Sequence, residues 1–307
     1  MIERPQFESV AVAICTFRRP VQLAALLPSL AARLIEEASD LAATIVVIDD
    51  CPDGSAQQIV ADSLITSATV EYHNTASGNV SIARNAAIHH AVASDLVVCI
   101  DDDCLPEPGW FAELRRVCES TGAEIVTGHH EFVAPAGAPS WLTSQPFLHD
   151  HGHFEDASDP GTGNMANLLI RSDFLLRTGL RFRVGLGRTG GEDMVFFSDA
   201  RRSGAVVRHA ALSIVREPFL GHRVSTWYHL YRQLWLGNNE VAINRITATF
   251  PVHRLFLRGS RRVVSGLVRP LGRLARRQPP QLRWSVAVAG NGVGLLLGLC
   301  RVRLPHW

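Results

Sequence analysis

The sequence contains no lysine, so all 30 of its basic residues are arginines. No acidic residue follows Glu240, whereas twelve arginines lie beyond position 244. The net charge of +1 therefore hides two opposite regions, because the first 244 residues hold 18 arginines against 29 acids. This separation predicts a basic C-terminal region that faces an anionic surface.

The six cysteines include no CxxC pair, which argues against a CxxC-type zinc or redox motif. Several of them fall in expected strands, so we expect buried free thiols in a reducing compartment. The N-terminus has no apolar signal region. No segment reaches the ~20 apolar residues of a confident transmembrane helix. With 307 residues and 47% hydrophobic content, the chain can fold as one large domain or two smaller ones.

Two nucleotide-binding signatures are missing. No GxGxxG motif follows the first expected strand, which makes a nicotinamide or flavin enzyme unexpected. A P-loop is missing as well.

What the chain does contain is an alternation of strands and helices. Apolar runs that predict strands are followed by segments with helical spacing. The expected strands are 10–15, 44–48, 69–72 and 96–100. This order predicts an α/β fold of the Rossmann-like type, with a mostly parallel sheet covered by helices on both faces.

The most informative stretch is the buried run Leu96–Ile100, which ends in Asp101, Asp102 and Asp103. Three adjacent carboxylates repel one another and stay ionised together when a cation lies among them. Their oxygens suit Mg²⁺ or Mn²⁺. The alternative is the acidic first turn of a helix, since Pro106 and Pro108 precede a helical pattern.

Two further acidic pairs stand at the ends of expected elements. Asp49 and Asp50 follow the second strand, where acids are either solvated turn residues or acceptors for a base or ribose. Glu192 and Asp193 follow two glycines that allow a ligand close to the backbone, although helix N-termini favour acids in any case.

The stretch 129–163 is rich in proline, glycine and histidine and predicts a long irregular loop. Its motif His149-Asp150-His151-Gly152-His153 has metal-ligating side chains. Alternating histidines in a flexible surface loop are the favoured interpretation.

Five motifs in order resemble the family 2 inverting glycosyltransferases of the GT-A fold, and most of all the bacterial succinoglycan-type exopolysaccharide glucosyltransferases. They are Ile14-Cys15-Thr16-Phe17-Arg18-Arg19-Pro20, Val47-Ile48-Asp49-Asp50, Ser81-Ile82-Ala83-Arg84-Asn85, Ile100-Asp101-Asp102-Asp103 and Gly190-Gly191-Glu192-Asp193. Glu217-Pro218 and Arg223 strengthen the likeness. It covers residues 10 to 225.

The resemblance implies a site for a UDP-sugar and a divalent metal. The nucleotide-sugar would be bound by Thr16, Arg18, Asp49, Arg84, Asp101 and Asp102, with Thr16 and Asp49 at the uridine and Arg84 near the diphosphate. Asp101 and Asp103 would hold Mn²⁺ or Mg²⁺, with Asp103 as the direct ligand. Asp193 would be the catalytic base, and Glu192 would position it or the acceptor. A further metal ligand from the second half is also implied, and neither His209 nor His222 matches its position cleanly.

The C-terminal region predicts a basic amphipathic helix. Arginines recur from Arg254 to Arg277 on one helical face, and Phe256, Val263, Val264, Leu267, Val268, Leu271 and Leu274 fall on the other. This pattern favours in-plane binding to a membrane surface, while a nucleic-acid helix and a core-packed helix are the alternatives. The apolar stretch 284–299 is short for a span and suggests an interfacial or re-entrant segment.

Together these features predict a GT-A domain at 1–225 and a helical, membrane-associating region at 226–307. The expected reaction is inverting transfer of a hexose, glucose from UDP-glucose first, to a lipid-linked glycan at the cytoplasmic face of the inner membrane, with no nucleic-acid partner. The alternatives are another donor sugar such as galactose or rhamnose, a catalytically silent membrane scaffold, and a nucleotidyltransferase, for which Arg18 and Arg19 only hint at a phosphate loop.

Overall fold

The computed structural model describes residues 7–148, 154–219 and 221–305. These residues divide into two compact units. Unit 1 comprises 7–131, 154–188 and 192–217, and unit 2 comprises 132–148, 189–191 and the described part of 218–305. The chain thus changes unit close to residue 218, and the predicted domain boundary at residue 225 stays a prediction.

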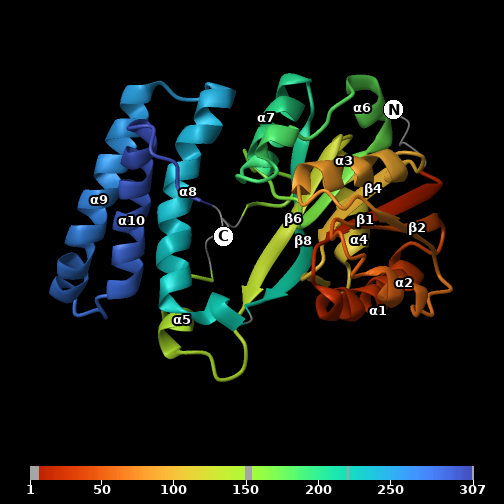
Figure 1. The fold of residues 1–307 in the computed structure, drawn as a ribbon, viewed down its shortest axis with the longest axis horizontal. Helices are drawn as coiled ribbons and strands as arrows, with labels where there is room; N and C mark the ends of the chain where they lie inside the picture. Colours follow the sequence, from red (N-terminus) through yellow and green to blue (C-terminus); the bar gives the residue numbers. More distant parts are fainter. Residues whose placement is uncertain (1–6, 149–153, 220, 306–307) are drawn as a thin grey trace. The chain divides into compact units, whose positions relative to one another are not determined.

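Eight strands form one mixed sheet in the order β3-β2-β1-β4-β7-β6-β8-β5 (Figure 1). The strands are β1 (Ser9–Thr16), β2 (Ala42–Asp49), β3 (Thr69–Asn74), β4 (Leu96–Asp101), β5 (Leu105–Pro106), β6 (Ile125–Val133), β7 (Asn167–Arg171) and β8 (Val207–Pro218). The first four in this order run parallel. β7 is antiparallel to β4 and β6, and β5 is antiparallel to β8. The Rossmann-like α/β sheet expected from the sequence is confirmed.

The parallel half of the sheet is buried on both faces, which explains its continuous apolar runs. In β1, Val10, Ala11 and Val12 are each at most 1% exposed, although successive side chains point to opposite faces. The run Leu96–Ile100 in β4 is buried in the same way. Apolar residues at every position therefore mark strands that carry helices on both sides.

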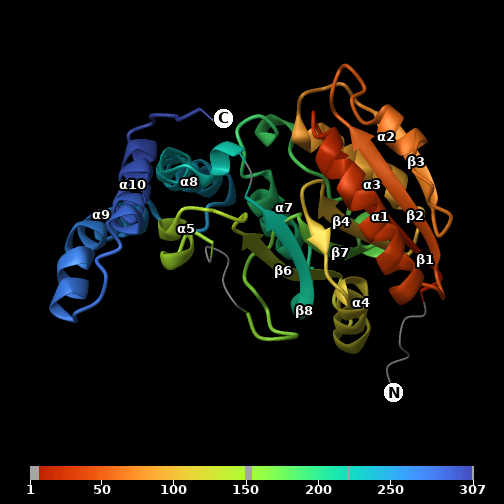
Figure 2. The ribbon, with the colours of Figure 1, turned by 90° about the horizontal axis from the view of Figure 1, so that it is seen from below.

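Helices cover both faces of this sheet (Figure 2). The apolar stripe of α1 (Pro20–Glu37) and α4 (Trp110–Thr121) packs on one face, next to the short α2 (Gln57–Ala61). On the other face lie α3 (Val80–Ala91), α6 (Ser172–Thr178) and α7 (Glu192–Arg202). The 3₁₀ turn η1 (Val184–Leu186) precedes α7.

The strand registers bring the polar strand ends to one edge. Thr16 pairs with Asp49 across β1 and β2, and Cys15 pairs with Asp101 across β1 and β4. The carboxyl ends of parallel strands form the usual ligand-binding edge of an open α/β sheet. The acids that follow separate strands in the sequence are therefore neighbours in space.

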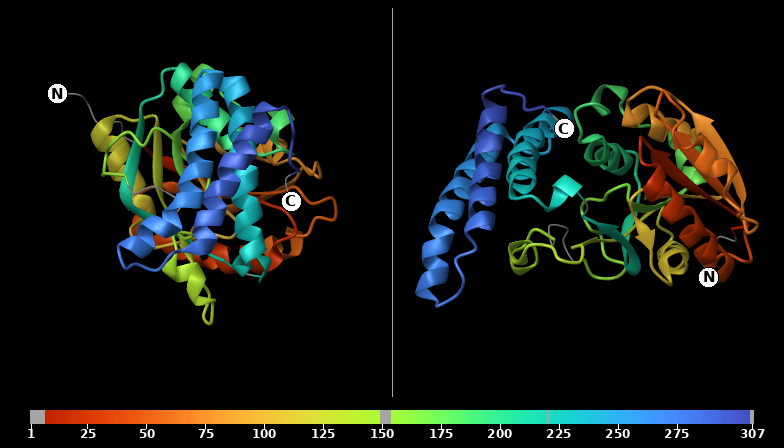
Figure 3. Two further views of the ribbon diagram at one scale, coloured as in Figure 1. Left: turned by 90° about the vertical axis from the view of Figure 1, so that its left-hand side faces the viewer. Right: turned by 60° about the horizontal axis from the view of Figure 1, so that its bottom comes forward.

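Unit 2 is mainly helical, with α5 (Ser140–Ser144), η2 (Gly221–Val224), α8 (Thr226–Thr247), α9 (Val252–Ala275) and α10 (Leu282–Leu299). α10 packs against both α8 and α9 (Figure 3). The approach is close: a Cβ atom on Gly294 would lie 1.9 Å from the carbonyl oxygen of Leu234. Only glycine permits this contact between α10 and α8.

The apolar face of the amphipathic helix α9 is exposed, as the sequence pattern suggests. Phe256, Leu267 and Leu271 keep 54%, 68% and 67% of their surface accessible. Arg258 and Arg262 instead form ion pairs with Glu240 of α8. The buried stripe of α9 is narrow and consists of Leu255, Gly259 and Gly266.

The apolar stretch near the C-terminus is a continuous helix, α10. Among the described residues it is the one helix whose length and composition would allow it to cross a membrane, with a mean hydropathy of 1.3. One third of this window is buried against the rest of the chain. Length and composition alone are weak support for a span.

The prediction of an irregular loop over 129–163 is wrong for its first residues, 129–133. β6 continues to Val133, and Gly128, His130 and Phe132 are buried while the residues between them are partly exposed. This alternation has the period of a strand, which the two histidines obscured. The motif 149–153 lies outside the described residues.

Candidate active site

The acidic residues lie at the carboxyl end of β4, where the sheet changes from parallel to antiparallel neighbours. Asp101 is the last residue of the strand. The chain then turns sharply, and the backbone N–H of Cys104 donates to the carbonyl oxygen of Asp101 over 3.1 Å. Three carboxylates are therefore confined to one tight turn.

The middle acid, Asp102, points inwards. It is 4% exposed and accepts hydrogen bonds from the Thr16 hydroxyl at 2.7 Å and from Arg19 Nη1 at 2.8 Å. The same Arg19 nitrogen lies 2.7 Å from Asp103 Oδ2. Burial raises the pKa of Asp102. Asp102 and Arg19 thus fasten the turn to the end of β1.

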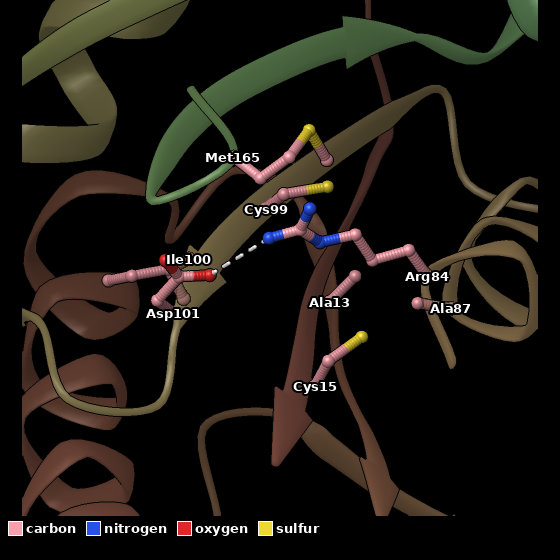
Figure 4. Close-up of a pocket in the computed structure, with 8 residues that line it drawn as sticks. All are labelled: Ala13, Cys15, Arg84, Ala87, Cys99, Ile100, Asp101 and Met165. Atoms are coloured by element: carbon pink, nitrogen blue, oxygen red, sulfur yellow. Dashed lines mark ion pairs between the residues drawn. The ribbon is translucent and has the colours of Figure 1, made fainter. Parts of the chain in front are cut away.

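Arg84, on α3, connects the turn with the start of α7. Its Nη1 lies 2.7 Å from Glu192 Oε1 and also contacts the carboxylate of Asp193. Its Nη2 lies 3.8 Å from Asp101 Oδ1, as the dashed line in Figure 4 marks. The Arg84 side chain is 12% exposed, so this cation is held among acids with little water around it.

The acids around Arg84 outnumber the cation. Desolvation raises the pKa of Asp101 to about 7, against the opposing effect of Arg84, even though 40% of its side chain is accessible. Desolvation and the neighbouring Asp193 likewise raise the pKa of Glu192 to about 7. An excess of negative charge at this position creates a demand for a further cation.

A small pocket lies beside this ion pair (Figure 4). It is lined by Ala13, Cys15, Arg84, Ala87, Cys99, Ile100, Asp101 and Met165. Burial strongly raises the pKa of Cys15, and raises that of Cys99 to about 12. Both thiols are therefore neutral, and they make this part of the pocket lining apolar.

The end of β2 organises the neighbouring loops. Asp49 is fully buried and accepts from the backbone N–H groups of Cys51 at 2.9 Å and Ala56 at 2.7 Å, and from the Tyr72 hydroxyl at 3.2 Å. Asp50 accepts from the Thr75 hydroxyl, from the Ser77 backbone and hydroxyl groups, and from the backbone N–H of Asn79. Both acids hold loop backbone in place.

Asn79 is the N-cap of α3. Its side-chain oxygen accepts from the backbone N–H groups of Ser81 and Ile82, and its amide donates to the carbonyl of Val184 in η1. Capping of this kind stabilises a helix by about 1 kcal/mol. It also fixes the helix that presents Arg84.

The structure brings four predicted site residues into one group: Arg84, Asp101, Glu192 and Asp193. Thr16 and Asp102 are hydrogen-bonded to each other. Arg18 is exposed, has a positive φ of 55° and lies over the Phe17 ring at 5.3 Å.

Sequence reasoning gave Asn79 no role in the site, and it named Arg19 and Asp50 only within open alternatives, without assigning them to the site. Arg19 could have been found from its position, since it follows the first strand of a parallel sheet and faces the same edge as the acids. The polar run Thr75 to Asn79 before a helix is also a capping signal. The partner of that cap, Val184, is too distant in the sequence to be inferred.

The two histidines considered as metal ligands lie in different surroundings. His209 is 3% exposed within β8, where its Nδ1 is 3.1 Å from the Thr127 hydroxyl, and burial lowers its pKa to about 4. It is therefore a neutral histidine of the sheet. His222 belongs to η2 of unit 2, with its ring 5.3 Å from that of Tyr228.

The acidic turn fits a divalent cation. Its ligands would all be oxygens, which Mg²⁺ and Mn²⁺ prefer. Asp102 is committed to Thr16 and Arg19, which leaves Asp101 and Asp103 as the pair able to reach a cation.

Comparison with known proteins points to sugar transfer. The sequence model described as "Glycosyl transferase family 2" matches residues 11–177. The chain is 31% identical over 233 residues to the succinoglycan biosynthesis protein ExoM of Rhizobium meliloti strain 1021, covering 75% of this chain and 74% of that protein.

Among solved structures, the fold is similar to mannosyltransferase PcManGT from Pyrobaculum calidifontis in complex with GDP-Man and Mn²⁺. The TM-score is 0.64 at 12% identity, over 96% of this chain and 88% of that one. It is also similar to S. aureus TarS 1-349 in complex with UDP-GlcNAc, with a TM-score of 0.57 at 16% identity over 94% and 91% of the chains. These likenesses concern the GT-A fold alone.

Proposed function

The chain belongs to glycosyl transferase family 2, and from this we propose that it transfers a hexose from a UDP-sugar to an acceptor hydroxyl with inversion at the anomeric carbon. The observation that supports the proposal is the position of Arg84. Its guanidinium joins Asp101, at the acidic turn, to Glu192 and Asp193, at the start of α7. A metal-binding acid and a separate carboxylate base are what a single displacement needs.

In this proposal Asp193 is the catalytic base. Its carboxylate removes the proton of the acceptor hydroxyl while the acceptor oxygen attacks the anomeric carbon. The bond from that carbon to the diphosphate oxygen breaks at the same time, and its electron pair leaves with UDP. Attack opposite the leaving group with one base inverts the configuration. Glu192 is 8% exposed and positions Asp193 through their shared partner Arg84.

Arg84 would change partners when the donor binds. In the structure its charge is shared by three carboxylates. A diphosphate brings further negative charge and would compete for the guanidinium, which binds phosphate oxygens in a fork-like geometry. Release of Asp193 from Arg84 would then free the base for the acceptor.

Asp101 and Asp103 would hold a Mn²⁺ or Mg²⁺ ion, which neutralises charge on the leaving diphosphate as a Lewis acid. Arg19 keeps Asp103 oriented through its 2.7 Å contact, and Asp102 anchors the turn. Arg18, Thr16 and Asp49 would line the uridine side of the site, with Asp49 acting through the loop that it organises.

For the donor we propose UDP-glucose, with UDP-galactose and a rhamnose donor as the alternatives to be compared. The relative ExoM is named for succinoglycan biosynthesis. By analogy the acceptor would be a lipid-linked glycan of exopolysaccharide synthesis.

We also propose that α9 binds the cytoplasmic face of the inner membrane as an in-plane helix. Its exposed apolar residues and its exposed arginines, among them Arg254 and Arg261, match a surface of anionic phospholipids. Each arginine near such a surface contributes about 1 kcal/mol. The ligand is therefore an acidic bilayer rather than a nucleic acid, which would not use the apolar face.

The function can be tested by incubating the full-length protein with UDP-glucose, UDP-galactose and UDP-GlcNAc, each with Mn²⁺, Mg²⁺ or EDTA. Release of UDP reports donor cleavage, and NMR of the product reports the anomeric configuration. We expect metal-dependent cleavage of UDP-glucose, and a β-linked product from the α-linked donor. Metal-dependent binding without turnover for any donor or extracted lipid acceptor would favour a silent scaffold.

A further inference from the structure

A second cluster of metal-ligating side chains lies next to the acidic turn, with different chemistry. Cys104 follows the turn, His130 lies in β6 and Glu217 lies near the end of β8. Their exposures are 0%, 8% and 6%. Among the described residues this is the one such cluster whose members are all buried.

The sheet explains why the three meet. β8 lies between β6 and β5, and Leu105 of β5 pairs with Arg216 of β8. The antiparallel register therefore places Cys104 opposite Glu217. Arg216 and Glu131 form an ion pair, with 3.0 Å between their nearest atoms, on the solvent side. His130 precedes Glu131 in β6, and Glu217 follows Arg216 in β8. Successive side chains of a strand point to opposite faces, so His130 and Glu217 are neighbours on the other face of the sheet.

The distances suit a tetrahedral zinc ion. His130 Nε2 lies 2.9 Å from Glu217 Oε2 and 3.8 Å from Cys104 Sγ. The three donor atoms all lie within 4.8 Å of one another. Zinc bonds are ~2.3 Å long to sulfur and ~2.0–2.1 Å long to nitrogen and oxygen. Around a tetrahedral ion, sulfur and nitrogen would therefore be roughly 3.6 Å apart, and nitrogen and oxygen roughly 3.3 Å apart. The two distances from His130 Nε2 therefore differ from the tetrahedral values by a few tenths of an ångström.

The donor set separates this cluster from the acidic turn. One sulfur, one imidazole nitrogen and one carboxylate oxygen are ligands that Zn²⁺ takes together, whereas Mg²⁺ and Mn²⁺ prefer oxygen alone. The same nitrogen, His130 Nε2, faces both the thiol and the carboxylate. One metal ion can take the thiolate, the imidazole nitrogen and the carboxylate as ligands at the same time.

We propose that Cys104, His130 and Glu217 bind one Zn²⁺ ion, with a fourth position left to water or another donor. Binding releases the thiol proton to solvent as the sulfur–zinc bond forms. The ion would join β5, a strand of only two residues at the sheet edge, to β8 and β6. It would thereby hold the turn of Asp101–Asp103 in place. This site does not depend on the proposed sugar transfer.

The first test uses the full-length protein without a histidine tag. Purified protein should contain about one zinc per chain after EDTA has removed loosely bound metal. Replacement of zinc by Co²⁺ should give the near-ultraviolet charge-transfer absorption of a cobalt–thiolate bond, together with the visible bands of tetrahedral cobalt. An all-oxygen site gives no thiolate absorption. Failure of Co²⁺ to produce this band in folded wild-type protein would overturn the proposal.

Variants then locate the thiolate. Cys104→Ser should abolish the band, whereas Cys118→Ser, at an equally buried thiol that contacts the Ala123 carbonyl, should keep it. Glu217→Gln keeps the sulfur and should weaken zinc binding at least about tenfold. Asp103→Asn should keep both band and zinc even if donor binding is lost. A band that survives in folded Cys104→Ser, or unchanged zinc affinity in Glu217→Gln, would contradict the site.

Discussion

Arg84, in the middle of α3, forms an ion pair with Asp193, the second residue of α7. The proposed diphosphate ligand and the proposed base are thus in direct contact before any substrate is present. This contact holds the carboxylate of Asp193 in a fixed position at the start of α7.

Asp193→Asn should slow sugar transfer by about a hundredfold or more, because the amide cannot accept the proton of the acceptor. UDP binding should survive, since Asp101 and Asp103 lie on another element. Transfer rate and UDP affinity are measured on the same preparation. The matched control is Asp173→Asn, at the second residue of α6 with 60% of its side chain exposed, which should have no effect. Near wild-type transfer in Asp193→Asn would move the base elsewhere, with Glu192 the first candidate.

Asp103→Ala should abolish the metal dependence of UDP binding, because cation and diphosphate bind as one unit. Calorimetry with UDP, with and without Mn²⁺, measures this. Asp62→Ala, at an exposed acid after α2, is the control. Asp102→Ala should behave differently and lower the free energy of unfolding by about 1–3 kcal/mol, since it leaves Thr16 and Arg19 without their buried acceptor. An Asp103→Ala protein with unchanged metal-dependent affinity would refute the assignment.

Asp101→Asn should stabilise the metal-free protein in a pH-dependent way. The pKa of Asp101 rises from 3.8 to about 7 on folding, so the folded state binds this proton more tightly. Ionisation therefore costs stability progressively between those two pH values, and asparagine removes the cost. The partial exposure of the side chain screens the effect, so we expect on the order of 1 kcal/mol, or ~2–4 °C in Tm, above pH ~7.

Thermal unfolding in EDTA across this pH range gives the measurement. The difference in Tm between Asp101→Asn and wild type should vanish as the pH falls towards 4. A difference that is constant with pH would show that the carboxylate is not titrating as described.

Binding to anionic vesicles should depend on the exposed face of α9. The double variant Leu267→Gln and Leu271→Gln removes two side chains that are more than two-thirds exposed, so folding should be unaffected. Sedimentation with phosphatidylglycerol vesicles should fall at least about tenfold. Wild-type binding should also weaken with salt. Leu64→Gln, at a leucine 96% exposed in unit 1, is the control. Equal loss in this control would count against α9.

The sheet and its functional edge could be predicted from the sequence, because each parallel strand is an apolar run directly followed by polar residues. The registers Thr16–Asp49 and Cys15–Asp101 confirm that these ends are neighbours. The direction of each side chain could not be predicted. Asp102 was expected to bind the nucleotide-sugar, which stays a prediction; in the structure its oxygens bond Thr16 and Arg19.

Contacts between segments that are distant in the sequence could not be predicted from local sequence patterns. Arg84 and Glu192 are 108 residues apart, and His130 and Glu217 meet only because β8 lies between β6 and β5. No local propensity encodes such pairings. His130 itself was assigned to a loop, because the stretch 129–163 is rich in proline, glycine and histidine. The alternating burial of its neighbours is visible only in the folded chain.

The order of strands in the sheet also bears on how the chain is made. β4 is complete at Asp101, but its second neighbour, β7, begins only at Asn167. During synthesis the nascent sheet β3-β2-β1-β4 therefore has an open edge of Leu96–Ile100 for the time needed to add the intervening residues, roughly 3–13 s at ribosomal rates. An open apolar strand edge can pair with another chain. Chaperone demand in the cell should consequently peak between the emergence of β4 and that of β7.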